Sequence, residues 1–544
     1  MQRIQRESRT VHSIVTALLG SALALGLAAC QGPDESEPAT LVEGFAGMIA
    51  ADEPRAALVG RDVLGNGGNA TDAAVAMYFT MAVTLPSRAS LGGGGTCVIF
   101  DNGDAVGAAL VFPPFVTAEG GLVPTGVRAM AAMHARQGRL KWGELLRPAE
   151  NLARFGHSAS RALARDIEIA AGLLAADPAL SQIFRSETGG LVGEGERIVQ
   201  PELSGVLSGI RSQGAAYVHA GPFAGRFAEL STEAGLPVSV ADMREAVPYF
   251  GDAIEISLGL TGRDIVYFPP PPSAGGTTAA QLWTLLTDVE SYQSLGTAEG
   301  AHLFAEAAMR AFADRGDWMA RDGSVGASVN AASLVEEARL ERLMEGYSSD
   351  RHSPLSSLAA QPPQTQEPPA GASFVAGDRF GNAAACSVSM NGLFGLGRSA
   401  PGTGIVLGRP PSAQANGYLS PVAAVIGNTT NGDLIFAGAA SGGSAAVSAL
   451  VNVMLDTVEE GEPLNNAVRA ARVHHGGRPD EIFFETGLNS RLVGDLQARG
   501  HRLQEVATVG RVNALFCEEG VLDEPENCQV VSDPRGKGLG KIAQ

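Results

Sequence analysis

The chain is short of basic side chains. Its 544 residues include 39 Lys and Arg against 58 Asp and Glu, which gives a formal net charge of −19. A protein this acidic repels phosphate backbones, so we expect no nucleic-acid partner, and a solvated acidic surface is enough to explain the charge. The sequence also lacks the spacings typical of zinc sites, with no C-x-x-C and no H-E-x-x-H. We therefore expect no metal and no cofactor.

The apolar run near the N-terminus is too short to favour a membrane-spanning helix. Residues 13–29 are apolar or small and follow a basic stretch that carries Arg3, Arg6 and Arg9. A spanning helix needs roughly 20 such residues. A basic region followed by a shorter apolar run is typical of a secretory signal.

The run ends in Leu-Ala-Ala-Cys at residues 27–30, which resembles a bacterial lipobox. In such a sequence Cys30 is lipidated and becomes the mature N-terminus, so the resemblance implies a membrane anchor on Cys30. We predict a signal peptide at 1–29, a polar tether at 30–41 and a lipid-anchored protein on the periplasmic side of the envelope. Gln31 after the Cys favours the outer membrane. A plain signal peptide and an anchor helix remain alternatives.

Only five cysteines are present, and four follow Cys30. Cys97 and Cys386 lie in apolar, strand-like runs, which predicts buried free thiols. Cys517 and Cys528 flank a loop-like acidic segment at 518–527. In an oxidising periplasm they can pair across that loop, and we favour this disulfide over two unpaired thiols.

The stretch at residues 371–397 carries the pattern that is most informative about the fold and function of the chain. It follows a Pro- and Gln-rich run at 361–369 that suits neither helix nor strand. It then reads as a strand at 373–376, a turn at 378–382 and a second strand at 383–390. A strand directly after a flexible linker is typical of a hydrolase that cuts its own chain and uses the new N-terminal residue as nucleophile.

This stretch resembles the nucleophile segment of the γ-glutamyltranspeptidase family. The matching positions are Gly381-Asn382, Ser389, Asn391 and Phe394-Gly395, and no gap is needed. Further segments similar to the family's motifs occur at 67–76, 85–95, 123–127, 142–153, 269–276, 302–315, 472–475, 479–480 and 532–535. The resemblance runs from about residue 47 to residue 538.

The resemblance implies an α/β fold, a four-layer αββα sandwich of the N-terminal-nucleophile hydrolase type. It divides the chain into a large-subunit-like half at 42–350, a linker at 351–370 and a small-subunit-like half at 371–544. The two halves would form one interwoven domain. The residues of two helices carry predictions of their own. The helix that opens at 69–76 is apolar all round, which predicts that it is buried. In the helix at 302–315, Glu306 and Arg310 are four residues apart, which predicts an ion pair on the surface.

Carried over by position, the family's catalytic parts are only partly present. The frame places Gly371 where the family has its nucleophilic Thr, and Ser373 where it has His. A supporting hydroxyl is implied at Ser389 and an amide that contacts the α-amine and substrate at Asn391. Gly442 and Gly443 match the pair whose N–H groups form the oxyanion hole.

The groups that would hold a glutamate are missing. The segment that matches the family's carboxylate-binding Arg is 111–114, which contains no Arg. The matching lid segment, 408–412, lacks an acidic residue, and the family's Ser pair is replaced by Gly417 and Tyr418. His474 and His475 match a family motif, but we interpret them as packing residues.

Three functions follow from these residues. The first is a catalytically degenerate envelope lipoprotein that binds a small peptide or amide. The second is an active amidohydrolase or acylase that uses Ser373 after cleavage of the 372–373 bond, because residue 373 faces the same side of its strand as residue 371. The third, which the missing groups disfavour, is hydrolysis or transfer of γ-glutamyl groups from glutathione-like substrates.

Overall fold

The computed structural model describes residues 44–259, 262–289, 292, 295–320, 324–325, 329–355, 370–410 and 421–544. These residues belong to one compact unit. The predictions for the signal peptide, Cys30 and the tether, for most of the linker and for Gly417 and Tyr418 lie outside the described residues.

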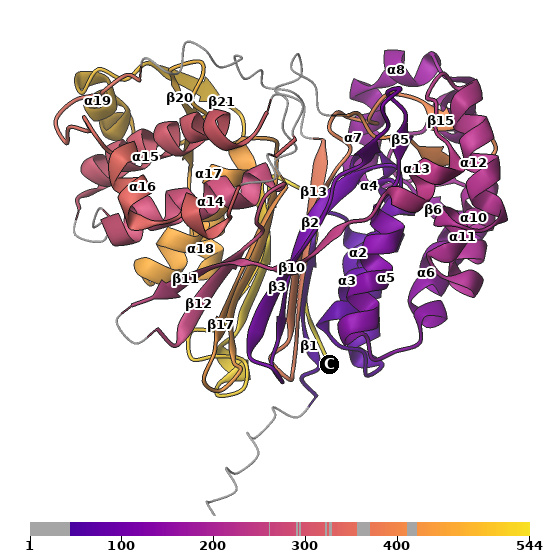
Figure 1. Cartoon of the computed structure of the whole chain (residues 1–544), viewed down its shortest axis with the longest axis horizontal. Helices are drawn as coiled ribbons and strands as arrows, with labels where there is room; N and C mark the ends of the chain where they lie inside the picture. The colour runs from indigo at the N-terminus through magenta and orange to yellow at the C-terminus, as the bar shows by residue number, and fades with distance from the viewer. Residues whose placement is uncertain are drawn as a thin grey trace, which may run out of the picture. The chain divides into compact units, whose positions relative to one another are not determined.

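Two antiparallel sheets form the centre of the fold (Figure 1). The first sheet has seven strands, in the order β10 (Tyr249–Asp252), β3 (Val106–Phe112), β2 (Gly94–Asp101), β14 (Ala383–Ser389), β13 (Gly371–Asp378), β1 (Gly47–Ala51) and β24 (Leu539–Ala543). The second has six, in the order β11 (Ile254–Leu258), β12 (Asp264–Phe268), β17 (Val422–Asn428), β18 (Leu434–Ser441), β22 (Arg511–Phe516) and β23 (Gln529–Ser532). Each sheet therefore combines strands that precede the linker with strands that follow it.

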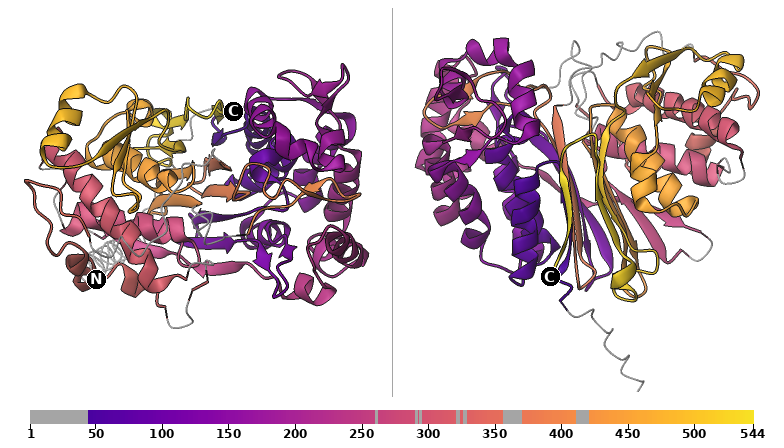
Figure 2. Two further views of the ribbon diagram at one scale, coloured as in Figure 1. Left: turned by 90° about the horizontal axis from the view of Figure 1, so that it is seen from above. Right: turned by 180° about the vertical axis from the view of Figure 1, so that it is seen from behind.

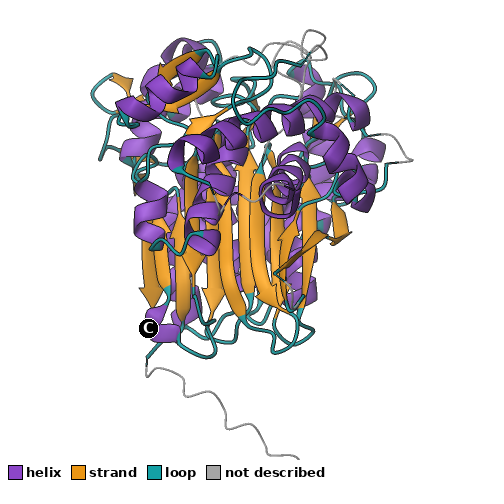
Figure 3. Ribbon diagram, turned by 90° about the vertical axis from the view of Figure 1, so that its left-hand side faces the viewer, coloured by secondary structure: helices purple, strands orange, loops and turns teal. Residues whose placement is uncertain are grey.

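Helices cover the outer face of each sheet (Figures 1 and 2). Beside the first sheet lie α2 (Pro54–Gly65), α3 (Ala70–Thr84), α4 (Pro86–Ala89), α5 (Gly126–Gln137), α6 (Trp142–Phe155), α7 (Arg161–Ile169), α8 (Ala171–Ala175), α9 (Pro178–Ile183), α10 (Pro201–Gln213), α11 (Ala216–His219), α12 (Pro222–Glu233) and α13 (Val240–Glu245). Beside the second lie α14 (Ala274–Thr284), α15 (Thr297–Trp318), α16 (Glu337–Leu343), α17 (Ala445–Met454), α18 (Leu464–Arg469) and α19 (Ser490–Ala498). Seen from the side, the strands run upright behind this second helical layer (Figure 3). The four-layer αββα prediction is confirmed.

The structure also contains small sheets of two or three strands outside the two central sheets. They are formed by β4 (Phe115–Val116) with β5 (Leu122–Val123), β6 (His157–Ser158) with β9 (Arg197–Ile198), β7 (Arg185–Ser186) with β8 (Gly190–Leu191), β15 (Ser399–Ala400) with β16 (Ile405–Val406), and β19 (Val473–His474) with β20 (Ile482–Glu485) and β21 (Leu503–Val506).

The layer between the two sheets is tightly packed and largely apolar. Val375 of β13 faces this layer, whereas Phe374 packs on the opposite side with the helices, as strand alternation requires. Gly427 allows the sheets to approach, because a Cβ there would come within 2.4 Å of the Phe100 ring. α3 is buried over its whole length, as predicted, and begins with a reciprocal cap between Asn69 and Asp72.

Two disulfides are present. Cys517 and Cys528 are bonded across their loop, as predicted. Cys97 and Cys386 are also bonded, so the prediction of free thiols at these positions is wrong. They lie directly opposite each other on β2 and β14, 289 residues apart in the chain. Strand topology creates this pair, and no local spacing could reveal it.

The prediction of a surface ion pair in α15 is also wrong. Glu306 and Arg310 are paired at 2.5 Å as expected from their spacing, but the side chains are 0% and 1% exposed. α15 packs against α14, α16, α19 and β19, so it has little free surface. The pair is therefore an element of the core.

The Cys517–Cys528 disulfide closes a short loop at the edge of the second sheet. The double variant Cys517→Ser/Cys528→Ser should lower the free energy of unfolding by about 3 kcal/mol, because the unfolded chain regains the freedom of an eleven-residue loop. Urea denaturation of the non-reduced protein measures this loss. Alkylation of both cysteines in the unreduced wild type would contradict the bond itself.

Candidate active site

The first residue of β13, called here the head of the strand, is Gly371. The resemblance described above places the family's nucleophile at this position. Gly371 is buried and lies opposite Ser389 of β14. A Cβ at this position would come within 2.8 Å of the Val388 carbonyl oxygen, and it would lie 3.6 Å from Cβ of Ser441 and 3.8 Å from Cβ of Ser389. A side chain at 371 would thus point between the sheets, toward the end of β18. The structure brings together the head of the strand and the supporting hydroxyl that the sequence indicated.

The Gly442-Gly443 turn joins β18 to α17 beside this position. Both residues have positive φ, 130° and 66°. Gly442 packs against Gly510, where a Cβ would come within 2.8 Å of the Gly510 Cα. A Cβ on Gly443 would meet no heavy atom within 4 Å. Steric contact therefore requires glycine at position 442. Open space adjoins Gly443, where a backbone N–H can bind an anion.

Ser389 and Asn391 form hydrogen bonds within the loop that follows β14. The Ser389 hydroxyl accepts a hydrogen bond from the Asn391 backbone N–H at 2.9 Å. The Asn391 side-chain amide donates to the carbonyl of Pro410 at 3.1 Å, and its backbone has φ 53°. Both groups lie close to the head of β13, but their hydrogen bonds order the loop.

Ser373 sits in the middle of a continuous strand and is fully buried. Its hydroxyl accepts a hydrogen bond from the Asn513 amide at 2.8 Å. Its backbone N–H donates to the Asp52 carboxylate at 2.9 Å, and its carbonyl accepts from the Asp52 N–H at 3.0 Å. The hydroxyl points toward the second sheet, which confirms that residues 371 and 373 share a face.

A buried arginine holds the strand immediately before Ser373. Arg511, at the start of β22, donates to the Gly371 carbonyl at 2.9 Å and to the Ser441 hydroxyl at 3.0 Å. The Asp52 carboxylate lies 4.0 Å away and accepts from the Ser441 hydroxyl at 3.0 Å. Burial lowers the pKa of the Arg511 guanidinium to about 10. The guanidinium is nevertheless charged at neutral pH and neutralises Asp52.

Asp52, Arg511 and Asn513 were not predicted. A weak signal existed, because Asp52 follows β1, Arg511 begins β22 and Asn513 lies within β22, and a polar side chain in or beside a strongly apolar strand is unusual if it is buried. The pairing itself could not be found, since Asp52 and Arg511 lie on different sheets and at opposite ends of the chain.

A second buried arginine lies near this network. Arg88 of α4 binds Asp166 through two hydrogen bonds of 2.7 and 2.6 Å, and Ser87 donates to the same carboxylate at 2.7 Å. The third guanidinium nitrogen, Nη1, is buried and has no hydrogen-bond partner among the described residues. In contrast, 111–112, where the family motif would place its Arg, form the buried end of β3.

His474 of β19 packs against α17, and His475 follows it in the chain. His474 contacts Ser448 through Nδ1 at 2.8 Å, its ring meets the Phe312 ring edge-on, and burial lowers its pKa to about 3. It is neutral at physiological pH. His475 bonds through Nε2 to Asp480 at 3.2 Å. These contacts are those of packing residues.

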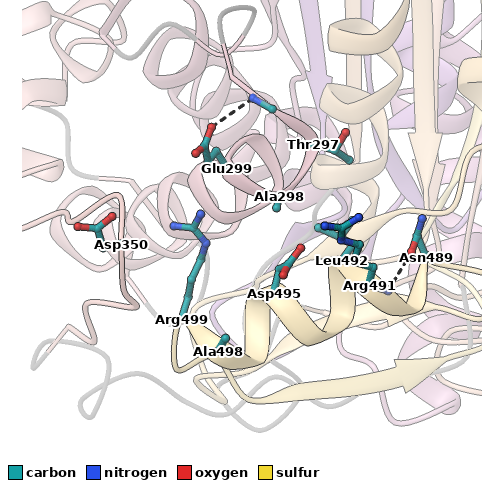
Figure 4. A pocket seen from close by; sticks show the side chains of 11 residues that line it. Thr297, Ala298, Glu299, Asp350, Asn489, Arg491, Leu492, Asp495, Ala498 and Arg499 are labelled. Atoms are coloured by element: carbon teal, nitrogen blue, oxygen red, sulfur yellow. Dashed lines mark hydrogen bonds between the residues drawn. The ribbon is translucent and has the colours of Figure 1, made fainter.

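A separate pocket of about 750 Å³ opens between the N-terminal turn of α15 and α19 (Figure 4). Glu299 and Thr297 line it from α15, and Arg491, Asp495 and Arg499 line it from α19 and the residue after it. It shares no residue with the head of β13 or the Gly442-Gly443 turn. It is therefore distinct from the candidate active site.

Two antiparallel sheets between helical layers, with a strand head beside a Gly-Gly turn, define the class of N-terminal-nucleophile hydrolase folds. Within that class the chain belongs to the γ-glutamyltranspeptidase family, whose sequence profile, described as Gamma-glutamyltranspeptidase, matches residues 56–110 and 117–543.

Relatives over nearly the full length have differing names. The chain is 27% identical to a glutathione hydrolase proenzyme of Pseudomonas aeruginosa, over 96% of this chain and 98% of that protein. It is also 27% identical to the acylase ACY 1 proenzyme of Pseudomonas sp. strain V22, over 90% and 92%. The crystal structure of a cephalosporin acylase from Bacillus halodurans superposes with a TM-score of 0.76 at 21% identity, over 94% and 99%. That likeness concerns the fold.

The Asp52–Arg511 pair yields a stability prediction. Arg511→Met should lower the free energy of unfolding by about 3–5 kcal/mol, because it leaves the Asp52 carboxylate buried without its cation. The double variant Asp52→Asn/Arg511→Met should recover most of that loss, since neither charge remains. Urea denaturation of the three proteins measures both effects, and a double variant no more stable than Arg511→Met would contradict the pairing.

Proposed function

We propose that this chain is a non-hydrolytic member of the γ-glutamyltranspeptidase family that remains a single chain and binds a small peptide or amide. One observation carries the proposal: the residue at the head of β13 is Gly371, which has no hydroxyl to attack either its own chain or a substrate.

The proposed ligand site is the space beside Gly443, Gly371 and Ser389. The Gly442-Gly443 turn would offer backbone N–H groups to a carbonyl or carboxylate oxygen of the ligand. The absence of an Arg at 111–114 disfavours recognition of a glutamate α-carboxylate at the position that the family motif uses. Binding without turnover is the function that these groups support.

An acylase that uses Ser373 is the second candidate, and one contact favours it. In that reaction the Ser373 hydroxyl attacks the Ala372 carbonyl, the 372–373 C–N bond breaks, and the hydroxyl proton passes to the nitrogen. Water then hydrolyses the resulting ester and leaves a free α-amine on Ser373. The Asp52 carboxylate, 2.9 Å from the Ser373 nitrogen, would pair with the ammonium group. Full burial of Ser373 and its hydrogen bond to Asn513 weigh against attack.

Hydrolysis of glutathione is less well supported. Several relatives are named glutathione hydrolases, but Gly371 and the segments at 111–114 and 408–412 lack the nucleophile and the charged groups that this activity would use.

We further propose that the protein is a lipoprotein of the cell envelope, anchored through Cys30. The support is the sequence of residues 1–31, with its basic stretch, apolar run and Leu-Ala-Ala-Cys ending. Among the helices that the structure describes, none has both the length and the apolar character to cross a membrane.

Intact-mass measurement of the mature protein tests the main proposal. We expect one chain without a break near residue 371, because no hydroxyl stands at the head of β13, and no release of glutamate from glutathione. Ser373→Ala should leave this pattern unchanged.

Two fragments, the smaller beginning at Ser373, would instead support the second candidate function, an acylase that uses Ser373, if Ser373→Ala abolished the cleavage. Ser387→Ala is the matched control, because Ser387 is a buried serine directly opposite Ser373 on β14. Cleavage must persist in this control for the assignment to Ser373 to hold.

A further inference from the structure

Three histidines and a glutamate meet inside the helical layer that covers the second sheet. His302 and Glu306 lie one turn apart on α15, and their side chains point the same way. His501 follows α19, and His352 follows α16 in the chain. His302, Glu306 and His501 are buried. The group thus joins residues from both halves of the chain.

The donor atoms of three of these side chains converge. His302 Nδ1, His501 Nε2 and a carboxylate oxygen of Glu306 all lie within 4.8 Å of one another. His302 Nδ1 and His501 Nε2 are 2.7 Å apart, and His501 Nε2 is 3.9 Å from Glu306 Oε1. Two imidazoles and one carboxylate on three corners of a small buried space form a donor set that zinc and similar divalent ions prefer.

Outer contacts already orient each donor. The Nε2–H of His302 donates to the Ser348 carbonyl at 2.8 Å, which fixes the lone pair on Nδ1. The Nδ1–H of His352 donates to Glu306 Oε1 at 2.6 Å, and Arg310 donates to Glu306 Oε2 at 2.5 Å. His352 also contacts Asp480 at 3.3 Å. Metal-bound histidines and carboxylates typically have such partners on their remaining atoms.

We propose that His302 Nδ1, Glu306 Oε1 and His501 Nε2 bind one divalent transition-metal ion of the zinc type. Without metal, the short contact between the two imidazole nitrogens requires a proton between them, donated by His501 to His302. The ion takes the place of that proton when the His501 hydrogen sits on Nδ1. The nitrogens then separate to about 3.3 Å, as tetrahedral geometry with bonds of about 2.05 Å requires.

The pocket in Figure 4 is lined by residues close in the chain to two of these histidines. Asp350 and Arg499 line the pocket, and His352 and His501 lie two residues further along the chain from each. The His352 N–H donates to the Arg499 carbonyl at 2.7 Å, so the two segments are side by side. The pocket carries three carboxylates, of Glu299, Asp350 and Asp495, against two guanidinium groups, of Arg491 and Arg499.

The role that follows is structural. The ion would connect α15 to the segments after α16 and α19, and it shares no ligand with Gly371, Ser389 or the Gly442-Gly443 turn. The inference is independent of the proposed function, because metal binding at this site requires neither cleavage nor a ligand at β13.

Metal analysis of the tag-free, full-length mature protein tests the proposal. After removal of metal with a chelator, addition of Zn²⁺ and extensive dialysis, we expect one equivalent of zinc per chain. Zn²⁺ should also raise the unfolding temperature, because it binds the folded state. Co²⁺ in place of Zn²⁺ should give visible absorption bands typical of nitrogen and oxygen ligands.

Glu306→Gln and His501→Gln should each weaken Zn²⁺ affinity at least tenfold and abolish the thermal shift. His219→Asn is the matched control, a buried histidine bonded to the Met243 carbonyl and outside the site, and it should bind like the wild type. If Glu306→Gln fails to fold because Arg310 loses its partner, His501→Gln decides. No retained zinc in the wild type would overturn the proposal, as would equal retention by His501→Gln or equal loss in His219→Asn.

Discussion

Hydrogen bonds from β13 to β1 on one side and to β14 on the other hold the fold together. β1 comes from the beginning of the chain, whereas β13 and β14 come from beyond the linker, so the first sheet cannot form until distant segments meet. The Cys97–Cys386 bond fastens the next strand pair along, between β2 and β14. Placing β13 in the middle of the sheet fixes residue 371 between the sheets and beside the Gly442-Gly443 turn. The candidate site is therefore a consequence of strand order.

The same strand order places two buried charges beside residue 371. Asp52, at the end of β1, and Arg511, at the start of β22, meet beside Gly371 and Ser373. Burying a charge costs several kcal/mol, and a partner recovers that cost only when further hydrogen bonds are made. Here Ser441, Asn513 and the Ser373 N–H supply those bonds. The arrangement therefore stabilises the contact between the first residues of β13 and the second sheet.

The sequence predicted features set by local pattern and missed those set by topology. The apolar, capped α3, the strands on either side of residues 378–382 and the Gly-Gly turn were all predictable, because short motifs determine them. The Cys97–Cys386 bond was missed because 289 residues separate the two cysteines. The burial of Glu306 and Arg310 was missed because their charge suggested solvent, and only the neighbours of α15 exclude it. Asp52 and Arg511 had no recognisable spacing for the same reason.

The buried polar groups also stabilise this scaffold independently of any chemistry at residue 371. Asp52 with Arg511, and His302 and Glu306 with His501, each join one half of the chain to the other in the core. Such contacts stabilise one continuous chain as well as two cleaved pieces, because their strength depends on burial and geometry and not on chain continuity. None of these contacts uses a side-chain atom of residue 371. Selection for folding alone would therefore keep these contacts whether or not the chain is catalytic, and their presence is no sign that the protein is an enzyme.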